Sequence, residues 1–418
     1  MHDVCDQIVF TKHYEITVMQ LVRLLHNLFK KELPFVHKTR LQNLLDACKT
    51  AIQSNKLYLT GLGRELSNKN KTCSNIQKID RLLGNLHLQK EQNDFYKVMF
   101  SYLIQDNSTP WLHVDWTCIS SVTNLYVLRA SLSMSGRSIV IYEECHPKKK
   151  ENNHATHKAF LNQLKKLLPP SVQPIIVTDA GFRGPWFQHI LDLGWNFVGR
   201  LRNKNLVLLD GSSAWELSHT FFAKATATPS YLGHGVLTKE GKVPAHFVAY
   251  RGKNKKRHKI NNNKKPSRSG KSKLYSKSNT EPWILVSSLP LTTKNANLAV
   301  NIYRQRMRIE ENIRDTKCPH YGLGLKCSRS KSSARLGILL LIAAIATFAA
   351  WLAGIETKRR GLAADFQAHS AKFKSSLSIV FLGRQALKKG FKISEIQLFR
   401  ALKMLLQINK ETQLEAPI

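Results

Sequence analysis

One basic segment of the chain, residues 303–317, carries the residue types needed to handle a phosphate group. Its sequence, YRQRMRIEENIRDTK, contains four arginines, a lysine, a tyrosine and three acids. On a helix that turns about 100° per residue, Glu311 and Asp315 point away from the face that contains Glu310. The residues that share that face, within an arc of roughly 60°, are Tyr303, Arg306, Glu310 and Lys317. This spacing predicts a single carboxylate on a stripe of phosphate-binding side chains.

Two aspartates near the ends of apolar segments extend this candidate site. Asp115 lies in PWLHVDWT and Asp179 in PIIVTDAGF. Three converging carboxylates need cations beside them, and Mg²⁺ prefers oxygen ligands. Two such ions about 3.5–4 Å apart can activate an attacking oxygen and stabilise the leaving oxygen of a phosphodiester. The alternative is structural, because Arg306 and Arg314 stand four residues either side of Glu310 and could form ion pairs with it.

The charge of the chain points to a polyanionic partner. Its 418 residues include 64 Lys and Arg against 28 Asp and Glu, a formal charge of +36. Nucleic acid is the first candidate partner, and an anionic membrane surface is the second. Seven cysteines without a CxxC pair indicate a reducing cytosol rather than a disulfide framework or a zinc site. The N-terminal sequence also lacks the layout of a secretion signal.

The elements that must position these residues are predicted from hydrophobic periodicity. Residues 1–105 have the three-to-four spacing of helices, and Thr60–Asn85 is compatible with a helix-turn-helix. After Pro110 the pattern predicts three antiparallel strands, a helix, a fourth strand, a helix and a fifth strand. If the first and fourth strands are neighbours, the two aspartates sit side by side at one sheet edge. His154 and His157, on one face of the first of these helices, are expected to face solvent.

About 130 residues separate Asp179 from Glu310, too many for a simple connection. The strand-like segments NLVLLD, PAHFVAY and PWILVSSL predict an inserted β subdomain. Within it, residues 251–277 hold twelve Lys or Arg and no acid. Such a run is often only a solvated surface, but its density favours a loop that contacts phosphates.

One charge-free segment of twenty residues, Leu336–Ile355, has the length of a membrane span. It is rich in alanine and has basic residues on both sides, so it gives no clear orientation signal. A helix buried on all sides of a large core has the same composition. We favour the buried helix and expect no membrane association.

At this level of detail the sequence resembles the bacterial DDE transposases of the insertion-sequence-four family, in the transposon-ten branch. The family signature Y-x2-R-x3-E-x6-K matches at every position of the stripe described above. Further matches are DWT at Asp115, TDAGF at Asp179, RLLGN at residues 81–85, YGLGL at 321–325 and WLAG at 351–354. The resemblance covers most of the chain.

The resemblance implies an α/β fold. Its RNase H-like catalytic core, a mixed five-stranded sheet with helices, would be interrupted by a β insertion and flanked by helical N- and C-terminal regions. The implied regions are a helical DNA-binding domain (1–105), the first part of the core (106–205), the insertion with its basic loop (206–290), the second part of the core with the Glu310 helix and the buried apolar helix (291–356), and a helical C-terminal region with dimer contacts (357–418).

The resemblance also implies cut-and-paste transposition. Asp115, Asp179 and Glu310 would be the catalytic residues and would hold two Mg²⁺ ions, for which Mn²⁺ could substitute. A homodimer would bind the terminal inverted repeats of double-stranded DNA, cleave them through a hairpin and join the ends to target DNA. The expected location is the cytoplasm, at the nucleoid. The alternative is a catalytically inactive DNA-binding protein derived from a transposase.

Five residues would contact DNA if the resemblance holds. Three of them, Tyr303, Arg306 and Lys317, belong to the signature. Trp283 occupies the place of an aromatic residue that captures an extruded base, although it could equally anchor a strand in the core. Met307 occupies the place of a wedge beside that base, although simple packing would explain it too.

Overall fold

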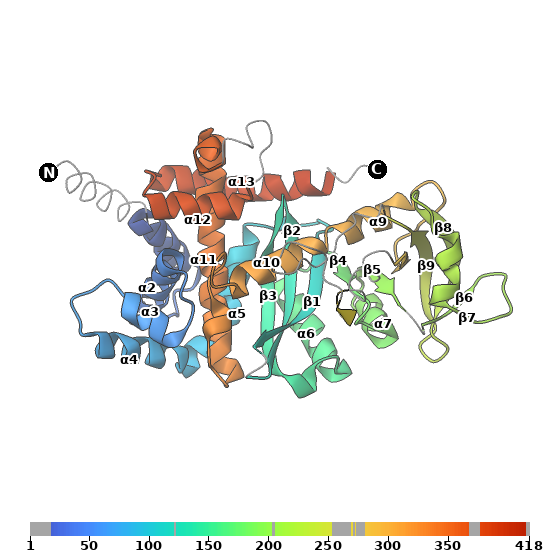
Figure 1. The fold of residues 1–418 in the computed structure, drawn as a ribbon, viewed down its shortest axis with the longest axis horizontal. Helices are drawn as coiled ribbons and strands as arrows, with labels where there is room; N and C mark the ends of the chain where they lie inside the picture. The colour runs from blue at the N-terminus through green and yellow to red at the C-terminus, as the bar shows by residue number, and fades with distance from the viewer. Residues whose placement is uncertain are drawn as a thin grey trace. The chain divides into compact units, whose positions relative to one another are not determined.

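The computed structural model describes residues 18–120, 123–202, 205–252, 269–270, 272, 281–367 and 377–414. Contacts between residues divide the described chain into two compact units. The first unit contains the residues up to Val172 and those from Met307 onward. The second unit is Gln173–Arg306. Both contain helices and strands (Figure 1), which confirms the predicted α/β class.

The first unit contains a three-stranded antiparallel sheet with the order β3-β2-β1. Its strands are β1 (Trp111–Ser120), β2 (Leu125–Met134) and β3 (Arg137–Pro147). Asp115 lies opposite Arg129 on β2, which in turn lies opposite Glu143 on β3. Residues paired in this way point to the same face of a sheet. Trp116 points to the other face, because successive side chains of a strand alternate.

Helices cover both faces of this sheet. The face of Asp115 carries α10 (Met307–Lys317), and the face of Trp116 carries α6 (His154–Leu167). The prediction that His157 faces solvent is wrong, because only 5% of it is exposed. Its Nε2 atom accepts a hydrogen bond of 2.9 Å from Trp116 Nε1. The pairing of these two side chains between helix and strand could not be read from helical periodicity alone.

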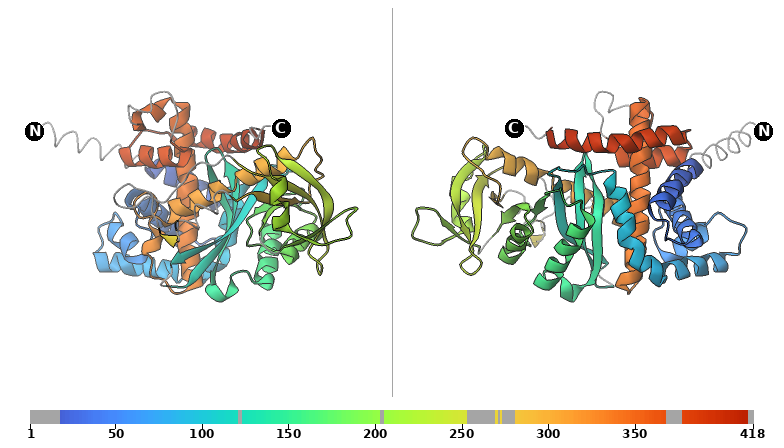
Figure 2. Two further views of the ribbon diagram at one scale, coloured as in Figure 1. Left: turned by 45° about the vertical axis from the view of Figure 1, so that its right-hand side comes forward. Right: turned by 180° about the vertical axis from the view of Figure 1, so that it is seen from behind.

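A long helix, α11 (Ser333–Arg359), forms the centre of the first unit. It lies between the N-terminal helices and the strands, and two views agree on this arrangement (Figures 1 and 2). It is the one helix among the described residues that is long and apolar enough to cross a membrane, yet 94% of its apolar window is buried. The predicted buried helix is therefore confirmed.

The C-terminal helices pack closely against α11. They are α12 (Ile379–Lys389) and α13 (Glu395–Leu414), with the short 3-10 turn η4 (Leu362–Phe366) before them. A Cβ atom at Gly383 would lie 1.8 Å from the carbonyl oxygen of Ala350, so only glycine allows this approach of α12 to α11. A Cβ at Gly354 would meet the carbonyl oxygen of Ile379 at 1.9 Å.

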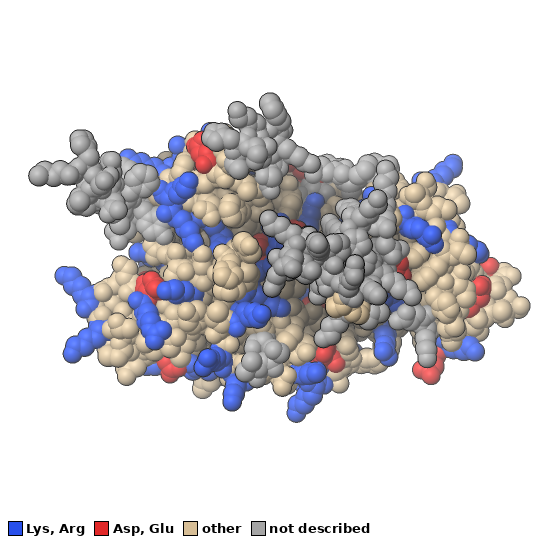
Figure 3. Space-filling model, viewed as in Figure 1, with Lys and Arg blue, Asp and Glu red and all other residues tan. Residues whose placement is uncertain are grey.

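The N-terminal part of the first unit is helical, as predicted. After a helix at residues 18–32, its elements are α2 (Lys38–Ser54), α3 (Leu59–Glu65), α4 (Thr72–Leu83) and α5 (Leu86–Ser101). The helices α3 and α4 form a close hairpin, because a Cβ at Gly63 would lie 2.6 Å from the Cα of Ile76. Lysine and arginine side chains are prominent on the face that Figure 3 shows. Arg64, Lys69, Lys71 and Arg81 of this helical region are exposed.

The second unit has a mixed sheet with the order β4-β5-β10-β9-β8-β6-β7. Only β4 and β5 of this series are parallel, and the other recorded pairs are antiparallel. The strands are β4 (Ile175–Thr178), β5 (Asn196–Leu201), β6 (Leu206–Leu209), β7 (Glu216–Leu217), β8 (Ser230–Leu237), β9 (Val243–Tyr250) and β10 (Trp283–Ser287). The helical segments are α7 (Gly184–Asp192), η2 (Ser218–Lys224) and α9 (Asn297–Arg304).

The predicted order of strands and helices after Pro110 is found in the structure. The five sequence regions with their boundaries stay a prediction. Most of the basic loop, residues 251–277, lies outside the described residues. The strand expected at PWILVSSL is present as β10, and it pairs with both β5 and β9.

Candidate active site

The segment 303–317 is not one continuous helix, so the predicted single stripe is wrong. Helix α9 ends at Arg304 and α10 begins at Met307. The intervening amides of Gln305 and Arg306 bond to carbonyl oxygens three residues earlier, at 3.2 and 3.0 Å. If the two segments formed one continuous helix of 100° per residue, the buried side of α9 and the buried side of α10 would point in directions roughly 110° apart. The break allows each segment to bury its own apolar side within its own unit.

A buried ion pair fixes α10 over the sheet of the first unit. Arg129 Nε donates to Glu143 Oε2 at 2.7 Å, and both side chains are 1% exposed. Arg129 Nη1 also donates to Asn312 Oδ1 at 2.6 Å and to Thr316 Oγ1 at 3.4 Å on α10. Asn312 Nδ2 in turn donates to the carbonyl oxygen of Ser138 at 3.1 Å. The middle of α10 is thereby held at the level of Asp115, the residue opposite Arg129.

One flank of α10 is bound to β3 through two of its three acids. Arg137, the first residue of β3, donates from Nη1 to Glu311 Oε2 at 2.6 Å. The Nε atom of Arg137 donates to Asp315 Oδ2 at 2.8 Å. Glu311 and Asp315 are therefore both bound to Arg137 on β3. Their position agrees with the prediction that they point away from the face of Glu310.

The other flank of α10 is bound to β1 through Lys317. Its Nζ atom donates to Thr117 Oγ1 at 3.3 Å and to the carbonyl oxygen of Cys118 at 2.5 Å. Burial lowers the pKa of this ammonium, and Arg129 lowers it further. Glu310 is seven residues from Lys317 and shares this flank, because seven residues are nearly two helical turns.

The first unit therefore holds two of the predicted catalytic acids on related elements. Asp115 lies on β1 with its side chain on the face that α10 covers. Glu310 lies in the first turn of α10, on the flank that meets β1, and it is exposed. Asp115 is half-buried. Carboxylates that solvent can reach suit a hard, oxygen-preferring cation.

The second unit gathers Asp179, Tyr303 and Arg306. Asp179 follows β4, and its Oδ1 atom accepts a hydrogen bond of 2.8 Å from the amide of Gly181. Tyr303 is 4% exposed. Burial raises the pKa of its hydroxyl, the guanidinium groups of Arg306 and Arg200 lower it, and Asp179 raises it. These charges therefore lie within electrostatic reach of one phenol.

Arg200 is a member of this cluster that the sequence reasoning missed. It lies on β5, one residue after Gly199, which pairs with Thr178 in the parallel ladder. It therefore lies on β5 at the level of Asp179, the residue that follows β4. Arg200 Nη2 donates to Glu281 Oε2 at 2.9 Å. The available signal was a basic pair in the fifth predicted strand, WNFVGRLR, at the edge expected to bind ligand.

Trp283 and Met307 are the two predicted site residues for which packing alone is an alternative explanation. Trp283 begins β10, is half-buried, and packs its ring edge against Tyr303 with centroids 4.9 Å apart. The ring of Tyr250 lies 5.6 Å from it on the other strand of the pair. Met307 begins α10 and is 48% exposed, so it is not a core residue of its unit.

No group of three or more His, Cys, Asp or Glu side chains among the described residues is arranged to hold a metal ion. Asp115 and Glu310 belong to the first unit, and Asp179 belongs to the second. The oxygen donors supplied within either unit are of the type that Mg²⁺ takes. The joint use of all three acids remains a prediction.

Comparison with known proteins gives one family. The sequence model described as "Transposase DDE domain" matches residues 112–347, more than half of the chain. The matched range begins on β1 and includes Asp115, Asp179 and Glu310. No curated protein was found to match the chain. The chain therefore belongs to the transposase DDE domain family.

Proposed function

We propose that the chain is a cut-and-paste DNA transposase of the insertion-sequence-four type. The observation that carries the proposal is the asymmetry of α10. Arg137 binds Glu311 and Asp315 on one flank, whereas Glu310 shares the flank that Lys317 attaches to β1. That arrangement leaves Glu310 as the acid of the helix placed on the same side as Asp115.

The three acids would share one task. Asp115, Asp179 and Glu310 would hold two divalent cations, Mg²⁺ or Mn²⁺. When bound, such cations lower the barrier to attack on a phosphodiester by activating the attacking oxygen and stabilising the leaving one. The buried Arg129 would contribute by keeping α10 and β1 in register.

The basic residues of the signature would hold the DNA phosphates beside the scissile one. Arg306 and Arg200 are the cations around the buried Tyr303. Tyr303 would orient these two side chains, so its contribution to DNA binding would be partly indirect. Lys317 would secure α10 on β1 and supply positive charge near Glu310.

The reaction would proceed through a hairpin. Water would first nick one strand, and the freed 3′-hydroxyl would attack the opposite strand to form the hairpin. A second water would open the hairpin, and the 3′-hydroxyl that this step releases would attack a phosphodiester of the target DNA. The tight bend would extrude a base, which the partly exposed ring of Trp283 would stack against, with Met307 as the wedge. Two copies of the chain would hold the two terminal inverted repeats.

The test is a cleavage reaction with the full chain, Mg²⁺ and a duplex that contains the end of its own element. Nicked strands followed by hairpins are expected on a denaturing gel. A chain that binds the end but never nicks it, with Mg²⁺ or Mn²⁺ present, would instead be the inactive DNA-binding descendant. A flush double-strand break without a hairpin would contradict the proposed hairpin pathway, although it would still show that the chain cleaves DNA.

A further inference from the structure

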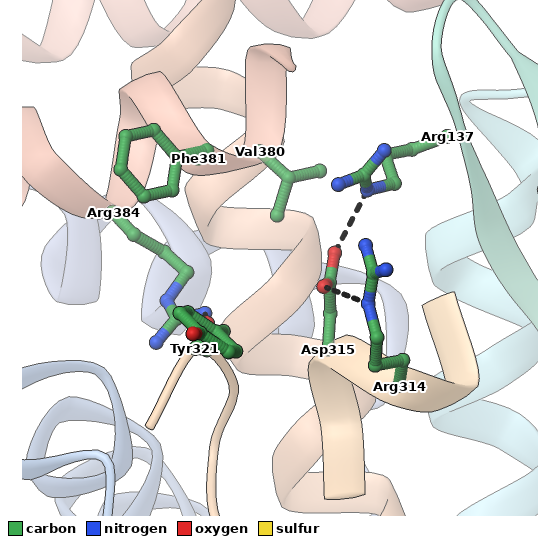
Figure 4. Close-up of a pocket in the computed structure, with 7 residues that line it drawn as sticks. All are labelled: Arg137, Arg314, Asp315, Tyr321, Val380, Phe381 and Arg384. Carbon is green, nitrogen blue, oxygen red and sulfur yellow. Dashed lines mark hydrogen bonds and ion pairs between the residues drawn. The ribbon is translucent and has the colours of Figure 1, made fainter. Parts of the chain in front are cut away.

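A cavity of about 310 Å³ opens on the first unit, away from the flank of α10 that carries Glu310. It lies between α10, the start of β3, the loop after α10 and the first turns of α12 (Figure 4). The residues that line it are Arg137, Arg314, Asp315, Tyr321, Val380, Phe381 and Arg384. Its size is at the lower end of the range for small-molecule sites, about 300–1,000 Å³.

The walls of the cavity carry positive charge that the protein does not fully neutralise. Arg137 is paired with Glu311 and Asp315. Arg314 has a side chain that is 57% exposed, and its recorded carboxylate contact, to Asp315, is as long as 4.0 Å. Arg384 is 9% exposed and donates to the carbonyl oxygens of Tyr321 and Gly322 and to Asn55 Oδ1, none of which is a carboxylate. Among the described residues, no hydrogen bond to a carboxylate is therefore found for Arg314 or Arg384, and the side chain of Arg314 is open to solvent.

The end of α12 that faces the cavity adds to this charge. Val380 and Phe381 lie in its first turn, directly after the N-cap residue Ser378, whose hydroxyl accepts from the amide of Phe381. The N-terminal end of a helix is the positive end of its dipole. Within the described part of the chain, the Nε atom of Arg384 is buried without a hydrogen-bond partner.

The cavity also presents two aromatic rings. Tyr321 is 72% exposed and Phe381 is 36% exposed, so solvent reaches both rings. The backbone that carries Tyr321 is held by Arg384, which bonds its carbonyl oxygen at 2.6 Å. The next residue, Gly322, is packed so closely that a Cβ would lie 1.9 Å from the carbonyl oxygen of Asp315. The exposed ring therefore stands on a fixed loop.

We propose that this cavity binds one unpaired nucleotide of a DNA strand, with the base against Tyr321 and Phe381 and the phosphate near Arg314 and Arg384. Sites for single strands combine cationic groups that follow the backbone with aromatic rings on which bases stack. A paired base is already stacked within its duplex and cannot enter a cavity. The inference rests on the proposed function, because it assigns a new subsite to the same DNA.

The residues of this site do not include Trp283, the aromatic residue predicted to capture an extruded base. Trp283 belongs to the second unit, and the cavity belongs entirely to the first. Asp315 and Arg137 lie on the side of α10 that meets β3, whereas Glu310 shares the side that meets β1. The nucleotide would therefore not be the one that is cleaved. It would belong to a single-stranded stretch elsewhere on the bound DNA.

The test measures the affinity of the full chain for a short fluorescent oligodeoxythymidine and for a duplex of the same length. Loss of base stacking in Tyr321→Ala should weaken single-strand binding about five-fold or more and leave duplex binding nearly unchanged. Arg314→Ala should weaken single-strand binding and lower its salt slope by about 0.7, the value for one phosphate contact. Both side chains are largely exposed, so neither change should unfold the chain.

Two matched controls have the same chemistry outside the cavity. Phe35→Ala removes another exposed aromatic ring, and Arg329→Ala removes another exposed cation. Neither should change the preference between single strand and duplex. Equal losses on both DNA forms, or no loss in Tyr321→Ala, would overturn the cavity proposal and leave the transposase proposal intact. A chain that binds neither DNA form would contradict both.

Photo-crosslinking locates the base directly. An oligonucleotide with 5-iododeoxyuridine should crosslink to Tyr321 and label the tryptic peptide Cys318–Lys326. Labelling confined to peptides without cavity residues would exclude the site. Free dTMP that displaces the oligonucleotide at equal concentration would show a site for free nucleotides and would overturn the assignment to a DNA strand.

Discussion

Asp115 and Arg129 face each other across the β1–β2 ladder, and the same Arg129 side chain bonds α10. One buried cation therefore relates the strand that carries Asp115 to the helix that carries Glu310. The cation is compensated by Glu143, whose other oxygen accepts from the hydroxyl of Tyr96 at 3.0 Å. The geometry of the two acids thus depends on side chains that need not touch DNA.

Glu310→Gln should reduce strand cleavage by more than about 100-fold, since even changes to residues that support metal ligands cost 10- to 100-fold. Binding to the end of the element should be nearly unchanged. Glu311→Gln is the matched control, because it removes an ion pair with Arg137 worth about 0–1 kcal/mol. Cleavage rates and gel-shift affinities of both variants decide the matter. Activity lost in the Glu311 variant but kept in the Glu310 variant would refute the assignment.

Arg129→Met should lower the free energy of unfolding by about 3–5 kcal/mol, because it leaves Glu143 buried without its cation. The double variant Arg129→Met with Glu143→Gln removes both charges and keeps an acceptor for Tyr96, so most of this stability should return. Cleavage should stay slow in the double variant, because Asn312 on α10 still lacks the hydrogen bond from residue 129 on β2. Chemical denaturation and cleavage rates measure the two effects. If the double variant cleaves DNA at the rate of the unchanged chain, Arg129 contributes to stability but not to the positioning of α10.

His157 should make the first unit less stable in acid. Burial lowers its pKa from 6.5 to about 4, so the folded chain stays neutral at pH values where the unfolded chain takes up a proton. Above pH 6.5 both states are neutral. Between about pH 6.5 and pH 4 stability falls as the pH falls, by about 2 kcal/mol from pH 7 to pH 5.

His157→Gln is the control for this effect, because glutamine can still accept from Trp116 Nε1 and does not titrate. Urea denaturation at pH 7 and pH 5 gives the comparison. The variant should lose less stability over this interval than the unchanged chain does. An equal loss in both proteins would show that other groups control the acid sensitivity.

Trp283→Ala should permit the first nick and slow hairpin formation by about ten-fold, since one stacked base is worth about 1–3 kcal/mol. An abasic site at the extruded position should partly restore the rate, because less unstacking is then needed. Tyr250→Phe, which keeps a ring beside Trp283, is the control. Rates of the two steps on intact and abasic DNA are the measurement. Joint failure of both steps without rescue would identify Trp283 as a structural anchor.

Neutralising the Lys and Arg residues of the basic loop, 251–277, should weaken binding to every DNA sequence. The dependence of affinity on salt should also become less steep, because fewer counterions are released on binding when phosphate contacts are lost. Titrations at several salt concentrations test this. An unchanged slope would mean that the loop is a solvated spacer.

Local sequence patterns predicted much of the fold. The alternation in LYVLRASLSM and RSIVIYEEC indicated the β2–β3 hairpin, and the absence of charge in Leu336–Ile355 indicated a helix buried on all sides. These features are properties of neighbouring residues. The separation of Glu310 from Glu311 and Asp315 also followed from helical periodicity within α10.

The features that could not be predicted depend on which surfaces meet. The break between α9 and α10 arises because each segment packs within a different unit, although both have helical sequences. The Arg129–Glu143 pair depends on strand register, since an arginine in an apolar strand does not reveal its partner. The place of Arg200 in the candidate site depends on the register of the parallel β4–β5 ladder, which puts it level with Asp179.

The central position of α11 has a consequence for the order in which the chain is made. Elements on both sides of it, from α2 and α5 to β3, bury apolar surface against a helix that begins at Ser333. During synthesis these elements leave the ribosome before α11 does. Their apolar surface stays exposed until α11 has been synthesised. Polypeptides released before Ser333 would therefore lack the centre of the first unit and would tend to aggregate. A complete first unit can arise only from ribosomes that have translated well past α10, the helix that carries Glu310.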